Sequence, residues 1–179
     1  MKRVFILAMI VAAACINLVG AQDNGVSLRR GFRDVELGAS FDVTEAALIR
    51  DPAFQYRGRP DVTMALSDRE RVIDTRGRVY MERGVFSFHN DRLFSISLYL
   101  SRRRLDYFQL FDQLRERYGD PRDLDPERAI WEDGTTRIEL ERPLTVRYLD
   151  LAMFEERRDR AETAEALEEV TREQFLEEF

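Results

Sequence analysis

The chain has 179 residues, a formal net charge of −6 and a sequence pI of about 5.0. This net acidity argues against a nucleic-acid-binding protein, whose binding face is expected to be basic. The length suits one compact domain with a hydrophobic core of its own.

The first 21 residues have the pattern of a secretory signal peptide. Lys2 and Arg3 precede an apolar run over residues 4–19, and small residues end the segment at Ala21. The alternative is a transmembrane anchor, but the run is shorter than the ~20 apolar residues that a membrane-spanning helix needs. We therefore expect cleavage after Ala21 and an exported chain.

Cys15 leaves a second interpretation of this segment open. Small residues precede it, as they do in a lipoprotein signal, although the chain stays apolar from Ile16 to Val19. Membrane contact is expected only if Cys15 is lipidated. Cleavage after Ala21 would instead remove this single cysteine together with Lys2 and Arg3, which takes the formal charge from −6 to −8 and leaves no thiol for a disulfide.

The first predicted elements are a leader, a short helix and an irregular segment. Residues 22–34 are polar and are expected to be mobile. Ser40 is a suitable N-cap for a helix from Phe41 to Arg50, and Asp51-Pro52 stops it because proline cannot continue the hydrogen-bond ladder. Residues 54–78 are predicted to be extended and partly irregular, with a short helical turn near Ser67 to Val72.

The middle of the chain predicts a hairpin followed by a helix. Apolar residues alternate from Val79 to Phe88 and from Leu93 to Leu100 on either side of Asn90-Asp91, which is typical of a β-hairpin. Residues 105–118 then carry apolar side chains at helical spacing, and Gly119-Asp120-Pro121 ends that helix.

Residues 129–141 predict a second hairpin around Asp133-Gly134, and residues 144–149 one more strand. The sequence thus predicts an α+β fold, with an antiparallel sheet of about five or six strands packed by two short helices. We expect one domain over residues 35–153 and an acidic C-terminal helix over 154–179. Helix and hairpin recur at 35–100 and 105–150, which indicates either a duplicated unit or a chance recurrence of common elements.

Part of the chain resembles a known family of small envelope lipoproteins. Gly38-Ala39-Ser40, Val43, Leu48 and Asp51-Pro52, followed by Phe88, Asp91, Leu93 and Ile96, are similar to the BamE (SmpA/OmlA) family in their order of helix start, proline stop and closing hairpin. The resemblance covers residues 35–100 and implies an envelope protein that binds partners without catalysis. A tandem version of the unit is similar to the β-lactamase inhibitor protein. The sheet of that protein binds an enzyme, and its fold relies on disulfides.

No pattern of catalytic or ligand-binding residues stands out. His89 is the only histidine and lies in a predicted turn, so we interpret it as a structural or surface residue. The acidic loop at residues 120–127 lacks the spacing of a calcium loop, and a phosphate-binding glycine loop is absent. Residues 102–104, three consecutive arginines, are interpreted as a solvated linker. The sequence predicts no enzyme, no cofactor and no metal.

Two surfaces are candidates for binding. On the acidic tail, apolar residues recur at helical spacing and either pack on the sheet or dock into a partner. The candidate residues of this tail surface are Phe154, Leu167, Val170, Phe175, Leu176 and Phe179. On the sheet, aromatic residues either belong to the core or form the floor of a groove. The candidate residues of this groove are Phe86, Phe94, Tyr99 and Trp131.

Two functions therefore stay open at the level of the sequence. The first is a non-catalytic exported protein of the periplasm or envelope that acts as an interaction or assembly module and binds another envelope protein. The alternative is a small secreted ligand-binding or enzyme-inhibitor domain that uses the aromatic face of its sheet.

Overall fold

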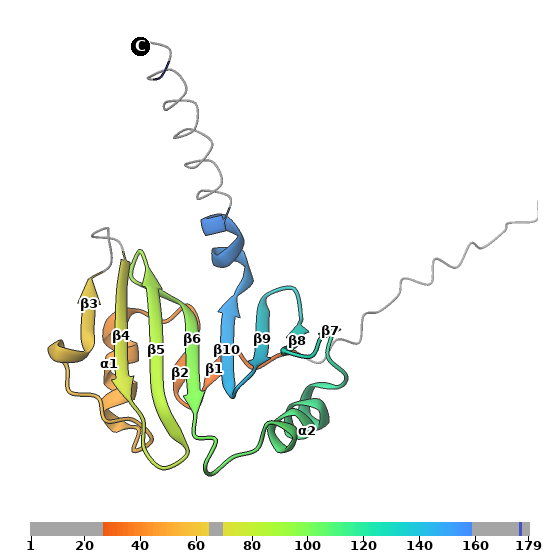
Figure 1. The fold of residues 1–179 in the computed structure, drawn as a ribbon. Coiled ribbons are helices and arrows are strands. Elements are labelled where there is room, and N and C mark those ends of the chain that lie inside the picture. Colours follow the sequence, from red (N-terminus) through yellow and green to blue (C-terminus); the bar gives the residue numbers. More distant parts are fainter. Residues whose placement is uncertain (1–26, 65–69, 159–175, 177–179) are drawn as a thin grey trace, which may run out of the picture.

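The computed structural model describes residues 27–64, 70–158 and 176. Its centre is an eight-stranded antiparallel sheet in the order β3-β4-β5-β6-β10-β9-β8-β7 (Figure 1). The strands are β3 (Val62–Met64), β4 (Glu70–Arg76), β5 (Met81–His89), β6 (Arg92–Leu100), β7 (Asp123–Leu124), β8 (Arg128–Glu132), β9 (Thr136–Glu141) and β10 (Thr145–Asp150).

The remaining elements are short. They are a two-stranded sheet of β1 (Gly31–Phe32) and β2 (Val35–Glu36), the helices α1 (Phe41–Arg50) and α2 (Tyr107–Tyr118), and the 3-10 turn η1 (Arg59–Asp61). Residues 151–158 are helical as well. The predicted α+β class is confirmed, but the predicted five or six strands are too few.

The main additional strand is β4. The sequence predicts residues 54–78 to be extended and partly irregular, with a helical turn near Ser67 to Val72, whereas β4 begins at Glu70 and pairs along its whole length with β5. Charged residues flank the apolar pair Val72-Ile73 in β4, and they form ion pairs across the strands, as Asp74 does with Arg83 at 2.5 Å. This cross-strand pairing stabilises a segment whose own β-propensity is weak. Residues 65–69 lie outside the described part of the chain.

The order of elements repeats once along the chain. α1 is followed by the strands β3 to β6, and α2 by the strands β7 to β10. The last strands of the two units, β6 and β10, pair antiparallel at the centre of the sheet. Antiparallel pairing of equivalent strands places a local two-fold axis between them, so the strand order of the second unit mirrors that of the first.

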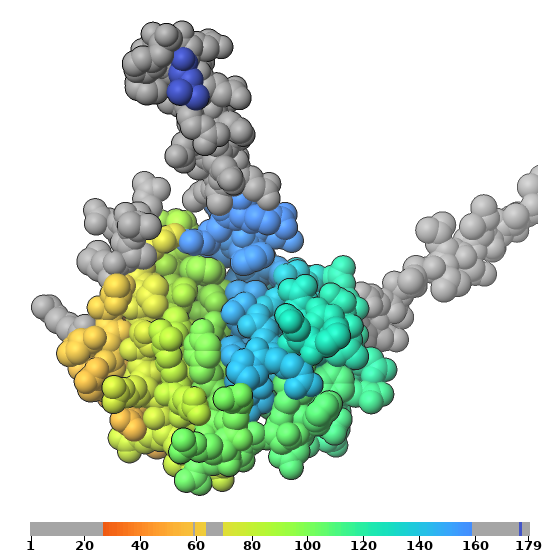
Figure 2. All heavy atoms as spheres, viewed as in Figure 1, coloured from red at the N-terminus to blue at the C-terminus, as the bar shows by residue number. Residues whose placement is uncertain are grey.

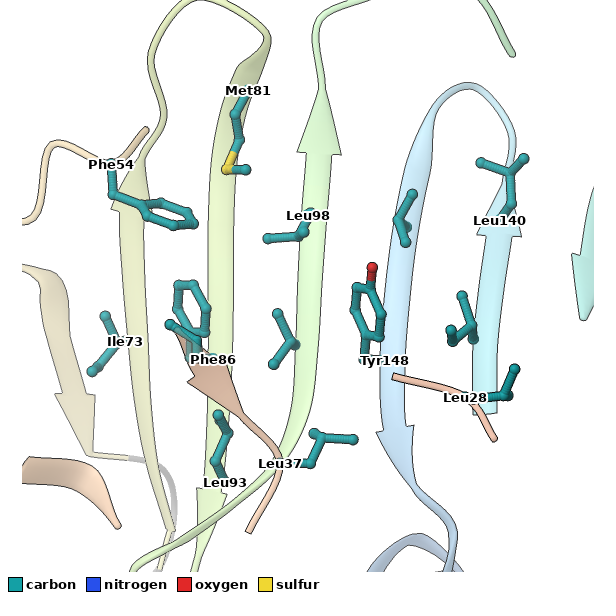
Figure 3. Close-up of a cluster of buried hydrophobic side chains, with 14 of the residues drawn as sticks. Leu28, Leu37, Phe54, Ile73, Met81, Phe86, Leu93, Leu98, Leu140 and Tyr148 are labelled. Carbon is teal, nitrogen blue, oxygen red and sulfur yellow. The ribbon is translucent and has the colours of Figure 1, made fainter. Parts of the chain in front are cut away.

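One face of the sheet carries the core. Residues directly opposite each other in an antiparallel ladder share a face, and one such row runs through six strands. In strand order this row is Ile73, Phe86, Ile96, Tyr148, Ile138 and Trp131. Each of these side chains is at most 7% exposed, and Figure 3 shows several of them in a single layer. Burial of a large apolar side chain contributes about 1.5–3 kcal/mol, so this row is a main source of stability.

The two helices contribute to this core from the same side. Ser40 caps α1 by accepting a hydrogen bond from the Val43 N–H. The centre of the Phe41 ring lies 5.2 Å from the centre of the Phe88 ring. Asp106 caps α2, and the Phe111 ring lies 5.9 Å from that of Trp131. α1, β1 and β2 lie behind the sheet in Figure 1.

The expected mobile leader, residues 22–34, is described from residue 27, and from there it packs against the core. Leu28 is buried, and its N–H donates to Asp133 Oδ2 at 2.7 Å. Arg30 forms an ion pair with Asp150 at 2.5 Å. Although the segment is polar in sequence, its Leu28 N–H finds a partner in the β8–β9 turn and its Arg30 finds one on β10. The folded core thus begins before residue 35.

Candidate functional site

The second face of the sheet is turned away from α1 and from the β1–β2 pair. It is the face toward the viewer in Figures 1 and 2. Its central row pairs Ser97 with Arg147, and Arg147 with Glu139. Small serines thus come from β5 and β6, whereas long charged side chains come from β8, β9 and β10. We call this the uncovered face.

The difference in side-chain length leaves a hollow of about 390 Å³ on the uncovered face. Ser87 and Ser95, which are directly opposite each other in the β5–β6 ladder, lie on one side of it. Its charged residues are Arg128, Arg137, Glu139, Glu141 and Arg147, and its apolar residues are Phe94, Leu149 and Phe154.

A β-bulge brings Phe94 into the hollow. Ser87 pairs with Ser95 and Phe88 pairs with Leu93, so Phe94 is the additional residue in β6. A bulge re-aims a side chain relative to the regular alternation. Phe94 therefore lines the hollow next to Ser95 instead of joining the core.

The helix at residues 151–158 forms one end of the hollow. Phe154 lines it directly. The guanidinium carbon of Arg157 lies 4.7 Å from the centre of the Phe94 ring, within the range of a cation–π contact. Arg157 also forms an ion pair with Glu70 at the start of β4. These contacts hold the helix against β4 and β6.

Arg147 is the centre of the charged cluster. Its Nε donates to Ser97 Oγ at 3.3 Å, and its Nη1 donates to Glu141 Oε1 at 2.9 Å and to Glu139 Oε2 at 3.3 Å. The Glu139 side chain is only 7% exposed. Burial raises the pKa of Glu139, the neighbouring Arg147 opposes this rise, and the carboxylate of Glu141 adds to it.

Replacing Glu139 with glutamine tests this burial. A raised folded-state pKa means that the folded protein holds the proton more tightly, so the stability of the native protein falls as pH rises from the ordinary glutamate value through the folded value. The unfolding free energy of E139Q relative to the native protein is therefore expected to increase as the pH rises from about 4, the ordinary glutamate range, through the raised folded-state value. Urea denaturation of both proteins at several pH values measures it, and a difference that shrinks as pH rises would contradict it.

Comparison of the sequence with known protein families shows that residues 30–160 match the TP0088 domain family. The chain belongs to this family. The match takes in both helix-and-strand units and every residue that lines the hollow of this TP0088 domain. No curated protein and no solved structure matches the chain.

The four predicted groove residues do not come together in the TP0088 domain. Phe86 and Trp131 are 0% and 2% exposed and lie in the core row, on the opposite side of the sheet from the hollow. Phe94 lines the hollow. Tyr99 lies on the uncovered face one row beyond the Ser97–Arg147 pair, where it pairs with Thr145. The groove prediction is therefore wrong for Phe86 and Trp131.

The predicted tail surface is described only in part. Phe154 lines the hollow, and Leu176 is 62% exposed. The other residues of this prediction, Leu167, Val170, Phe175 and Phe179, lie outside the described residues, as does Cys15.

The charged residues of the hollow were not singled out from the sequence. The signal was present in β9, where Arg137, Glu139 and Glu141 alternate with apolar residues. Alternation alone gives an ordinary solvated strand face. Only the register of β10 against β9, which puts Arg147 opposite Glu139, shows that these charges form one cluster.

The other sequence candidates are engaged within the fold. His89 Nδ1 lies 3.2 Å from Arg157 Nη1 and 3.7 Å from Glu70 Oε1. In the acidic loop, Asp125 pairs with Arg128 at 3.0 Å. Residues 102–104 form an exposed turn between β6 and α2. Among the described residues, no cluster of acidic, histidine or cysteine side chains is arranged for a metal ion, and no helix is long and apolar enough to cross a membrane.

A larger cavity of about 630 Å³ lies between the start of α2 and the β9–β10 turn. Its polar groups already serve the fold. Arg142 stacks 4.2 Å above the Tyr107 ring and donates to the Pro126 carbonyl, and Asp106 caps α2. The hollow is the candidate site because it lies on the sheet face that α1 and the β1–β2 pair leave open, and because a buried carboxylate, Glu139, lines it.

Proposed function

We propose that this TP0088 domain is a non-catalytic, exported binding module that holds another envelope protein on the uncovered face of its sheet. The observation that carries the proposal is the hollow itself. An ordinary solvated sheet face exposes its charged residues singly, whereas here Glu139 is buried, and Ser95 and Ser97 are at most 9% exposed. Buried polar groups on a face that the helices leave open are expected where a partner completes the surroundings.

The charged groups of the hollow are also held in place before a partner arrives. Arg147 is fixed by Ser97, Glu139 and Glu141, and Arg137 is fixed by Glu132 at 2.7 Å. A side chain that is already ordered loses little conformational entropy on binding, which favours affinity. Export is proposed from the signal-peptide pattern of the first 21 residues, and the absence of catalysis from the lack of a catalytic motif in the sequence.

A second candidate function is a small secreted domain that binds a small molecule. The volume of about 390 Å³ supports it, because it falls within the range of small-molecule sites. The shallow, charged surroundings favour a protein partner, since small-molecule pockets are mostly apolar.

Crosslinking capture from envelope fractions tests the proposal with a matched pair of variants. F94A removes a ring from the hollow, whereas F108A removes a ring that is 62% exposed on α2. We expect F94A to lower the yield of a specifically crosslinked partner by about tenfold, which corresponds to ~1.4 kcal/mol, and F108A to leave it unchanged. Loss of the partner with F108A alone, or with neither variant, would contradict binding at the uncovered face.

A further inference from the structure

We infer that the hollow recognises a carboxylate, carried by an acidic side chain of the protein partner. This inference rests on the proposed function and adds the chemistry of the contact. Its basis is the supply of hydrogen-bond donors in the hollow and the way in which the acidic residues beneath them are already used.

The arginines of the hollow are the charged groups that face the solvent. The side chains of Arg128, Arg137 and Arg147 are 49%, 28% and 32% exposed. Glu139 is 7% exposed and lies beneath the guanidinium groups. Glu141 is as exposed as Arg137, but both of its oxygens accept hydrogen bonds from Arg147, at 2.9 and 3.3 Å. An incoming group therefore meets guanidinium groups that are available and carboxylates that are occupied.

Several N–H donors of Arg137 and Arg128 are left unused by the fold. A guanidinium group has five N–H donors. Arg137 Nη1 lies 3.8 Å from Glu139 Oε1, too far for a hydrogen bond. Arg128 hydrogen-bonds through Nε to Asp125, and its two terminal nitrogens make no hydrogen bond with the described residues. These N–H groups are in the planar arrangement that suits a carboxylate.

The opposite side of the hollow offers hydroxyl groups. Ser87 and Ser95 face each other across the β5–β6 ladder, and within the described residues neither hydroxyl takes part in a side-chain hydrogen bond. Neither hydroxyl is buried without a partner. Ser87 is partly exposed whereas Ser95 is 9% exposed, so a carboxylate with one oxygen toward Arg137 has the Ser87 hydroxyl as the more open donor on this side of the hollow.

The preference for an anion rests on these free donors and not on net charge. Three arginines and two glutamates line the hollow, and Asp125 and Glu132 pair with Arg128 and Arg137 at 3.0 and 2.7 Å from outside it. The apolar walls of Phe94, Leu149 and Phe154 lower the local polarity, and charge-assisted hydrogen bonds are stronger in such surroundings.

NMR titration of the full chain tests the inference. The probes are three N-acetylated, C-amidated tripeptides, Ala-Glu-Ala, Ala-Gln-Ala and Ala-Lys-Ala, and the readout is the Nε–Hε cross-peaks of the arginines. We expect the glutamate peptide to shift the Arg137 and Arg128 signals in a saturable way, with an affinity about tenfold above that of the glutamine peptide and no saturable response to the lysine peptide.

Two variants control for the site. R137Q is expected to remove most of the response to the glutamate peptide, whereas R92Q, which changes an exposed arginine at the start of β6, should leave it intact. Retained dispersion of the backbone amide signals shows that each variant is folded. Equal responses to the glutamate and lysine peptides, or no response in the native protein, would overturn the inference.

The outcomes also separate the inference from the proposed function. If F94A abolishes partner capture while no peptide binds, the uncovered face still binds a protein, and the carboxylate chemistry is wrong. If free acetate produces the same shifts with the same affinity as the glutamate peptide, the carboxylate chemistry holds, and the assignment of the carboxylate to a protein side chain is overturned.

Discussion

Replacement of Trp131 with alanine is expected to lower the free energy of unfolding by about 3–5 kcal/mol. Trp131 is 2% exposed, and its ring packs 5.9 Å from that of Phe111 on α2. Its Nε1–H donates to the carbonyl of Gly119 at 2.9 Å, which fixes the end of α2. The substitution therefore leaves a cavity, removes a hydrogen bond and loosens a helix. Chemical denaturation followed by circular dichroism measures the loss.

Phe108 provides the comparison for Trp131. It is also aromatic and lies on α2 itself, but it is 62% exposed, so F108A is expected to lower the free energy of unfolding by less than about 1 kcal/mol. A loss in W131A no larger than that in F108A would show that the Trp131 site is not the packed core described above. We also expect W131A to unfold in a single transition, because the core row continues from β8 through β10 and β6 to β4.

The sequence was sufficient to predict the elements whose signals are local. The Asn90-Asp91 turn has positive φ angles of 49° and 62°, and this conformation is one that asparagine and aspartate tolerate better than other residues do. Ser40 and Pro52 bound α1 as expected. These signals depend on a few neighbouring residues, so no knowledge of the rest of the fold is needed to interpret them.

The strands β3, β4 and β7 depend on pairing instead. β3 and β7 have three and two residues, too few to show a period of two. β4 carries Arg71 and Asp74 among its apolar residues, and it becomes a strand because β5 lies beside it. The sheet therefore has more strands at both edges than the sequence predicts.

The candidate site could be predicted only in part, because the face on which a strand residue lies depends on register. Phe86 and Trp131 are aromatic strand residues, as Phe94 and Tyr99 are, yet the two pairs lie on opposite faces. The bulge at Phe94 shifts the alternation by one residue, and no local signal marks it. The arginine–glutamate cluster likewise forms only when β9 and β10 pair.

Two C-terminal truncations are expected to distinguish the hollow from the acidic tail as the contact with a partner. A chain that ends at Arg158 keeps Phe154 and Arg157, whereas one that ends at Met153 loses both. We expect the longer truncated chain to capture the partner as the full chain does, and the shorter one to lose about tenfold or more of the capture, ~1.4 kcal/mol or above.

The physical reason is the position of the helix at residues 151–158. Phe154 forms part of the wall of the hollow, and Arg157 connects the helix to Phe94 and Glu70. Removal of both residues opens the hollow at one end and exposes the Phe94 ring. Both truncated chains keep Leu151, which is 5% exposed, so the core is expected to fold in each. Loss of capture already at Arg158 would instead assign the contact to the removed tail, where the sequence shows eight acidic residues and two arginines between Asp159 and Phe179. Since the hollow is intact in that chain, such a result would contradict binding at the uncovered face, and the partner would then be expected to present a basic surface.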